Sequence, residues 1–227
     1  QQRKLDLVNN HLLTYMASNL AINYKRTDYA SQVIEKRNTS AEYLSTPVWD
    51  FEIGYIKLHH LELSAAAGSF EIFLNKFKGN YYVKDAAEKL SWCYYLQGNT
   101  NAAKSARDKV LQKGTVLTDA DKQALKNAQS GTWPNVLLLK ARLLNDGGYN
   151  SEALTILVGK TTSDFELPEH KLEFAYRVAR IYDDQGRKAE AVKMYSLTIQ
   201  LGSDRTEYYA ARAALQIGLI YESQGKK

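Results

Sequence analysis

The chain has 227 residues, of which 44% are hydrophobic and 24% charged, and these proportions are ordinary for a globular protein. Its formal net charge is +5, and acids are interleaved with the Lys and Arg residues, which argues against nucleic acid or a lipid surface as the main partner. No run of ~18 apolar residues occurs, so we expect no membrane span and a soluble protein, cytoplasmic or periplasmic. The single cysteine, Cys93, excludes an intrachain disulfide framework.

The first part of the chain carries apolar side chains at the spacing of two amphipathic helices. One stripe predicts a helix over about residues 3–23, and the next predicts a helix that begins near Tyr29 and ends near Tyr43. A polar break at residues 26–28 separates the two helices. The first stripe consists of Leu5, Val8, Leu12, Leu13, Met16 and Leu20.

All three prolines stand where a helix is expected to begin. Pro47, Pro134 and Pro168 predict helices over about residues 47–60, 134–145 and 168–184, with Thr46 as the N-cap of the first. Proline suits the first helical turn because its missing N–H would have no intrahelical partner there. A shorter helix is predicted within residues 118–131, since Thr118 can cap its start and Gly131 can stop it.

Small residues recur at a nearly constant spacing along these helices. Ala141, Ala179 and Gly218 are 38 and 39 positions apart, and each is followed three positions later by Leu or Tyr and then by Gly. Gly54 and Ser91 are earlier members of the series, 37 positions apart, while the step from Ser91 to Ala141 is 50 and leaves room for the inserted helix. Such a period is typical of stacked helical hairpins.

The repeated unit resembles the tetratricopeptide repeat (TPR), a helix–turn–helix of about 34 residues. The best copy comprises Ala175, Val178, Ala179, Tyr182, Gly186, Ala191, Tyr195 and Thr198. The resemblance implies an all-α fold, a right-handed superhelix of about five antiparallel hairpins within a single domain over residues 1–227. The expected repeats cover about residues 1–45, 46–79, 82–113, 133–160, 169–202 and the start of another at 206–227, with the insert at 114–131. We also expect the chain to be a fragment of a longer protein.

In the TPR family the first helix of each hairpin lines a concave groove, and the resemblance implies which side chains face it here. The implied ligand-binding residues are Tyr55, Trp92, Tyr95, Arg142, Asn145, Tyr176, Arg177, Arg180 and Arg212. Arginine forks grip carboxylates and aromatic rings give rigid contact area. We therefore expect a non-enzymatic scaffold that binds a peptide or protein segment, with the arginines holding acidic or carboxylate groups.

Other interpretations of the same residues stay open. Glu173 precedes Arg177 by four positions and Arg180 precedes Asp184 by four, so these arginines can instead serve ion pairs on the helix surface, and Trp92 can belong to the core. Two alternative functions stay open. One is self-association through the array ends, above all the C-terminal end. The other is the binding of a glycan or small molecule, or a role as an accessory to an enzyme. No catalytic, metal-binding or phosphate-loop motif occurs, so we expect no enzyme activity, no metal and no cofactor.

Overall fold

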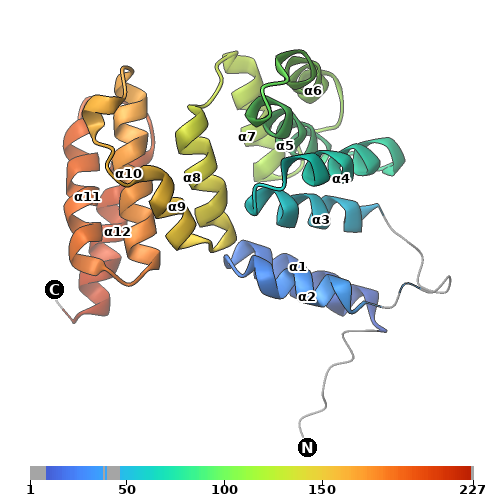
Figure 1. Cartoon of the computed structure of the whole chain (residues 1–227), viewed down its shortest axis with the longest axis horizontal. Helices are drawn as coiled ribbons and strands as arrows, with labels where there is room; N and C mark the ends of the chain where they lie inside the picture. Colours follow the sequence, from blue (N-terminus) through green and yellow to red (C-terminus); the bar gives the residue numbers. More distant parts are fainter. Residues whose placement is uncertain (1–8, 38, 40–46, 226–227) are drawn as a thin grey trace, which may run out of the picture. The chain divides into compact units, whose positions relative to one another are not determined.

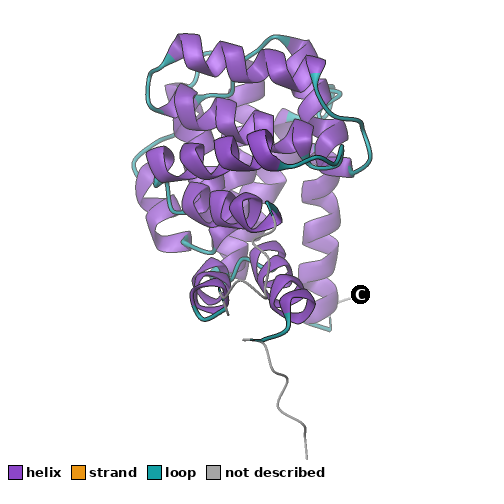
Figure 2. Cartoon of the chain, turned by 90° about the vertical axis from the view of Figure 1, so that its right-hand side faces the viewer, coloured by secondary structure: helices purple, strands orange, loops and turns teal. Residues whose placement is uncertain are grey.

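The computed structural model describes residues 9–37, 39 and 47–225. Across these residues the chain is all-helical, with twelve α-helices, one short 3₁₀ helix and no strand (Figures 1 and 2). The chain divides into two compact units, and each is described by itself below. Unit 1 comprises Gln1–Trp133 with Asp146–Gly148, and unit 2 comprises Pro134–Asn145 with Tyr149–Lys227. No helix in the described ranges is long and apolar enough to cross a membrane.

Unit 1 contains the first seven helices (blue to green in Figure 1). Helices that follow one another along the chain pack in pairs, α1 on α2, α3 on α4 and α5 on α6, and α3 also contacts both α1 and α5. Pairs that contact their successors in this way are typical of helical repeats. The helices are α1 (His11–Asn23), α2 (Thr27–Glu35), α3 (Val48–His59), α4 (Leu63–Lys76), α5 (Val83–Leu96), α6 (Thr100–Gln112) and α7 (Asp119–Ser130).

The inserted helix α7 joins its neighbours through a buried carboxylate. The Thr118 hydroxyl accepts a hydrogen bond from the Asp121 amide at the start of α7, and Gly131, with φ 70°, ends the helix. Both predicted helix signals are therefore confirmed. Asp121 is fully buried, and its carboxylate accepts the backbone amides of Tyr82 and Asp85 at the start of α5. Asp121 thus supplies the N-terminal cap of a helix 36 residues away, which attaches the insert to α5.

Unit 2 contains the remaining helices (yellow to red in Figure 1). Helix α10 packs against α9, α11 and α12, and α11 also packs against α12. Tyr195 of α11 is fully buried among these helices, and its hydroxyl donates to the Asp183 carboxylate at 3.2 Å. The helices are α8 (Val136–Gly147), α9 (Asn150–Leu157), α10 (Pro168–Asp184), α11 (Lys188–Leu201) and α12 (Tyr209–Ser223), with the 3₁₀ turn Thr162–Asp164 before α10.

The small residues of the repeat lie between packed helices in four of its copies. Gly54, Ser91, Ala141 and Ala179 are all buried. At Gly54 in α3 an added Cβ would lie 2.7 Å from the ring of Phe70 in α4, so only glycine allows this close approach. Gly218 in α12 is exposed, and an added Cβ would meet nothing within 4 Å.

Three predicted helix boundaries are wrong. Helix α2 ends at Glu35 and not near Tyr43, because Val33 and Ile34 are its last buried side chains and the Arg37 guanidinium donates to the Ile34 carbonyl. Helix α1 begins at His11 and not near residue 3, because the Asn10 carboxamide accepts a hydrogen bond from the Leu13 amide and caps the helix there. Residues 3–8 and 40–46, including the expected N-cap Thr46, lie outside the described residues.

Helix α8 begins at Val136, two residues after the predicted first-turn proline Pro134. The Asn135 carboxamide accepts the amides of Leu137 and Leu138, which makes Asn135 the N-cap. Helices α3 and α10 do begin at their prolines, with Pro47 as the N-cap and Pro168 as the first helical residue.

Candidate functional site

Three tyrosine rings gather where α10 meets the start of α12 in unit 2. Tyr176 of α10 lies 5.0 Å from Tyr209 and 6.3 Å from Tyr208, measured between ring centroids, and the last two rings are 4.4 Å apart. Tyr176 is buried, whereas Tyr208 is 54% exposed. The rings therefore form one aromatic cluster that extends from the core of unit 2 to its surface.

The charges of four of the predicted arginines act on two of these phenols. The charges of Arg177, Arg180 and Arg212 all act on the Tyr176 phenol, and those of Arg177 and Arg142 act on the Tyr209 phenol. The Arg177 guanidinium lies 5.8 Å from the Tyr176 ring centroid and 5.7 Å from that of Tyr209. We call these four arginines, with Tyr176, Tyr208 and Tyr209, the arginine–tyrosine cluster. It unites side chains from α8, α10 and α12.

The Tyr176 and Tyr209 phenols keep their protons at neutral pH. Burial raises the pKa of Tyr176 above its usual value, although the nearby arginine charges act in the opposite direction. Burial likewise raises the pKa of Tyr209. The hydroxyls are therefore hydrogen-bond donors beside a group of cations, a combination that suits an anionic ligand.

Arg177 and Asn145 are both engaged by carboxylates within unit 2. Arg177 is buried, and its Nε and one terminal nitrogen donate to Oε1 of Glu173 at 3.1 and 2.8 Å. The ion pair expected from the four-residue spacing is thus confirmed, although it is largely buried and not on the surface. The Asn145 amide donates to Asp184 and to the Asn150 side chain, each at 2.7 Å, and so connects α8 to α10 and α9. Arg212 is exposed.

The other predicted ligand-binding residues, Tyr55, Trp92 and Tyr95, belong to unit 1. Tyr55 and Trp92 contact a buried group of charged side chains on α5, and Trp92 is itself buried. The Tyr55 hydroxyl donates to Asp85 at 2.5 Å, and the Lys89 ammonium lies 4.0 Å from the Trp92 ring centroid. Both side chains thus contact charged residues of their own unit.

Lys89 is the centre of that charged group. Its ammonium lies 3.0 Å from Asp85 and 2.7 Å from Glu88, and the Asn127 amide of α7 donates to the second Glu88 oxygen at 2.7 Å. Asp85 and Glu88 are 2% and 5% exposed, so the two carboxylates depend on Lys89 for compensation of their charge. We call Tyr55, Asp85, Glu88, Lys89 and Asn127 the α5 polar network.

Tyr95 packs against the segment that follows α7. Its ring stacks on Trp133 with 4.7 Å between centroids, and the Arg107 guanidinium lies 3.3 Å from the centroid of Trp133. Arg107 also donates to the carbonyls of Gly131 and Thr132. Tyr95 thus helps to fix the segment after the insert onto α5, as Arg107 fixes it onto α6, and this is a packing role.

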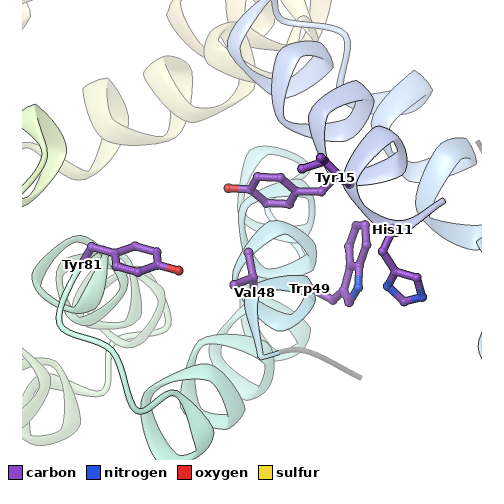
Figure 3. Close-up of a pocket in the computed structure, with 6 residues that line it drawn as sticks. His11, Tyr15, Val48, Trp49 and Tyr81 are labelled. Carbon is purple, nitrogen blue, oxygen red and sulfur yellow. The ribbon is translucent and has the colours of Figure 1, made fainter. Parts of the chain in front are cut away.

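A pocket of about 260 Å³ lies elsewhere in unit 1. The hydroxyl ends of Tyr15 and Tyr81 point toward the space between the two residues, with Val48 and Trp49 beside them (Figure 3). None of its lining residues is an acid, a lysine or an arginine, so this pocket does not suit a charged ligand. The lining residues are His11, Leu12, Tyr15, Val48, Trp49 and Tyr81.

Metal-binding and nucleophilic groups do not gather in the described parts of the chain. There, no group of three or more His, Cys, Asp or Glu residues could hold a metal ion. Burial raises the pKa of the Cys93 thiol to about 12, so this cysteine stays protonated and unreactive at neutral pH.

The ligand-binding residues predicted from the sequence include neither Tyr208 and Tyr209 nor the charged members of the α5 polar network. The Tyr208–Tyr209 doublet is visible in the sequence, but only the packing of α12 on α10 brings it to Tyr176. Asp85 and Lys89 have the four-residue spacing of an ordinary surface pair, and no local signal shows that both are buried.

The fold and these sites define an all-helical protein with packed neighbouring helices. Comparisons with protein families, with curated proteins and with solved structures find no match.

Proposed function

We propose that the protein is a non-enzymatic interaction scaffold that binds an acidic segment of a partner protein at the arginine–tyrosine cluster. The observation that supports this function is the position of the Arg177 guanidinium, 5.8 Å and 5.7 Å from the Tyr176 and Tyr209 ring centroids, together with the effect of the Arg142, Arg180 and Arg212 charges on these two phenols. Arginine guanidiniums recognise carboxylates through paired hydrogen bonds, and arginine and tyrosine are enriched among the residues that dominate binding energy at interfaces.

We further propose that the hairpins are of the TPR kind and stack into a right-handed superhelix. Burial of the small residues Gly54, Ser91, Ala141 and Ala179 supports the repeat. Contacts of α3 with α1 and α5, and of α10 with α12, support stacking of successive hairpins within each unit.

Charge reversal tests the binding proposal. In the variant Arg142→Glu/Arg180→Glu the acidic segment would meet repulsion where it met two cations, so capture of acidic peptides should be lost while the protein stays folded. Fluorescence anisotropy with degenerate peptides rich in Asp and Glu, together with circular dichroism of the variant, measures both properties.

The control is Lys193→Glu, a single charge reversal with half the charge change of the double variant, at an exposed position of α11. Binding should survive in this control. Capture of the acidic peptides by Arg142→Glu/Arg180→Glu at the affinity of the unchanged protein would remove the arginine–tyrosine cluster as the binding site.

Self-association is a second candidate function, favoured by exposed apolar side chains on α12. Leu215 and Leu219, one helical turn apart, are 54% and 47% exposed, and Tyr221 is 40% exposed. If copies associate through this face, the mass measured by light scattering should rise with protein concentration, and Leu215→Glu/Leu219→Glu should abolish the rise. A constant monomer mass in the unchanged protein would exclude this function.

A further inference from the structure

The pocket in unit 1 is lined by a buried hydrogen-bond donor that has no acceptor. Trp49, in the first turn of α3, is 5% exposed, and its indole Nε1 has no hydrogen-bond partner among the described residues. A buried N–H without an acceptor loses its hydration and gains nothing in exchange, so such groups are rare in folded proteins. Because Trp49 lines the pocket, a molecule bound there can supply the missing acceptor.

Aromatic rings from two helices and one loop form the walls of this pocket. The His11 and Tyr15 rings of α1 each lie 6.1 Å from the Trp49 ring, measured between centroids. Tyr81, in the segment before α5, lies across from Tyr15, and the hydroxyl ends of the two tyrosines point toward the space between them (Figure 3). The faces of aromatic rings carry partial negative charge and attract C–H groups. The walls therefore suit a ring whose faces present C–H bonds.

The polar atoms of the pocket come from α1, α3 and the segment before α5. The Trp49 indole can only donate, whereas the Tyr15 and Tyr81 hydroxyls can both donate and accept. The Tyr15 hydroxyl also hydrogen-bonds to Tyr82, and a phenol oxygen has capacity for a further bond. A ligand with several hydroxyl groups around its edge matches this mixture, whereas a hydrocarbon ring would leave the polar atoms unpaired.

The size and charge of the pocket narrow the ligand further. A cavity of about 150 Å³ holds benzene, so the volume of about 260 Å³ is enough for one six-membered ring with its substituents. The lining contains no acid, lysine or arginine. The Arg37 guanidinium lies 5.4 Å from the Trp49 ring centroid but donates to the Ile34 carbonyl at the end of α2. A charged ligand would therefore lose its hydration without gaining a counter-charge from the lining.

We propose that this pocket binds one uncharged hexopyranose unit, with the Trp49 indole donating to one sugar hydroxyl and the Tyr15 and Tyr81 hydroxyls bonding to others. The site is reachable from solvent, because Leu12 and Tyr81 of its lining are 67% and 40% exposed. It shares no residue with the arginine–tyrosine cluster and belongs to unit 1, so it adds a second ligand class to the proposed function.

The indole N–H groups allow the bound sugar to be located directly. The chain has three tryptophans, so a ¹H–¹⁵N spectrum of the full chain should show three indole resonances, which Trp49→Phe and Trp133→Phe assign. Methyl glycosides of glucose, galactose and mannose are titrated, with cyclohexanol and glucuronate as comparators. At least one hexoside should shift the Trp49 resonance saturably and leave that of Trp133 unchanged. Both comparators should bind at least about tenfold more weakly, since each loses several hydrogen bonds or carries an uncompensated charge.

Two variants and a matched control test the roles of the polar atoms, with affinity measured by calorimetry and folding by circular dichroism. Trp49→Phe keeps an aromatic ring but removes the donor, so hexoside affinity should fall by about three- to tenfold. Tyr81→Phe, at a partly exposed position, should have a similar effect and keeps the test valid if Trp49→Phe disturbs α3. Trp133→Phe makes the same change outside the pocket and should leave the affinity unchanged.

Four results would each overturn the sugar proposal. These are the absence of a saturable Trp49 shift with every hexoside, equal or tighter binding of cyclohexanol, equal binding of glucuronate, and full affinity retained in both Trp49→Phe and Tyr81→Phe. The variant Arg142→Glu/Arg180→Glu should keep the hexoside response. Sugar binding and the capture of acidic segments can therefore fail independently of each other.

Discussion

Replacement of Lys89 by methionine is expected to lower the free energy of unfolding of unit 1 by about 3–5 kcal/mol. Methionine preserves the aliphatic packing against Trp92 but removes the ammonium that compensates Asp85 and Glu88. Both carboxylates are almost fully buried, so water cannot replace the lost cation. The total stability of an ordinary domain is about 5–15 kcal/mol, so this loss should be a large part of it.

Tryptophan fluorescence during urea unfolding measures this effect in unit 1 specifically, because Trp49, Trp92 and Trp133 are the three tryptophans of the chain and all belong to that unit. Lys193→Met, at an exposed position of α11, is the matched control and should change stability by less than about 0.5 kcal/mol. An effect of Lys89→Met as small as that of the control would show that the α5 polar network is hydrated in solution.

Substitution of alanine at Gly54 is expected to destabilise unit 1 by about 1–3 kcal/mol. The new Cβ would lie 2.7 to 2.9 Å from three carbons of the Phe70 ring, which is itself fully buried and cannot move aside without displacing its neighbours. Helices α3 and α4 would have to separate or the ring would have to leave its favoured rotamer.

Gly218→Ala is the matched substitution at the equivalent repeat position of α12. An added Cβ there meets nothing within 4 Å, so the higher helix propensity of alanine should stabilise the helix by up to about 1 kcal/mol. Urea unfolding followed by circular dichroism and by tryptophan fluorescence compares the two variants. Equal loss of stability in both would contradict the close approach of α3 and α4.

Gly54 and Gly218 also show what the repeat pattern can and cannot indicate about a residue. The sequence alone identifies Gly54 and Gly218 as equivalent small residues, because their position in the pattern depends only on local spacing. Their surroundings differ because α4 covers Gly54 whereas Gly218 is exposed. A neighbouring helix is a tertiary feature, and the spacing within one helix carries no information about it.

The candidate site also combines features that the sequence indicates with features that only the tertiary structure decides. Family resemblance selected Arg142, Arg177, Arg180, Arg212 and Tyr176, and the structure places Arg177 beside Tyr176 while the other three arginine charges act on the Tyr176 or Tyr209 phenol. The same resemblance selected Trp92 and Tyr95, whose contacts in unit 1 are those of packed residues. Both groups occupy helix faces that look alike in sequence, since a three- to four-residue period defines a face but not what covers it.

The amino-acid sequence by itself determined the all-helical fold class, the inserted helix with its Thr118 and Gly131 signals, and the positions of the small residues, because periodicity and capping act over a few neighbouring residues. Only the tertiary structure decided that Asp85, Glu88 and Lys89 are buried and that Tyr208 and Tyr209 join the arginines. Charge burial and the convergence of distant side chains depend on which helices become neighbours, and that choice is made by the packing of the whole unit.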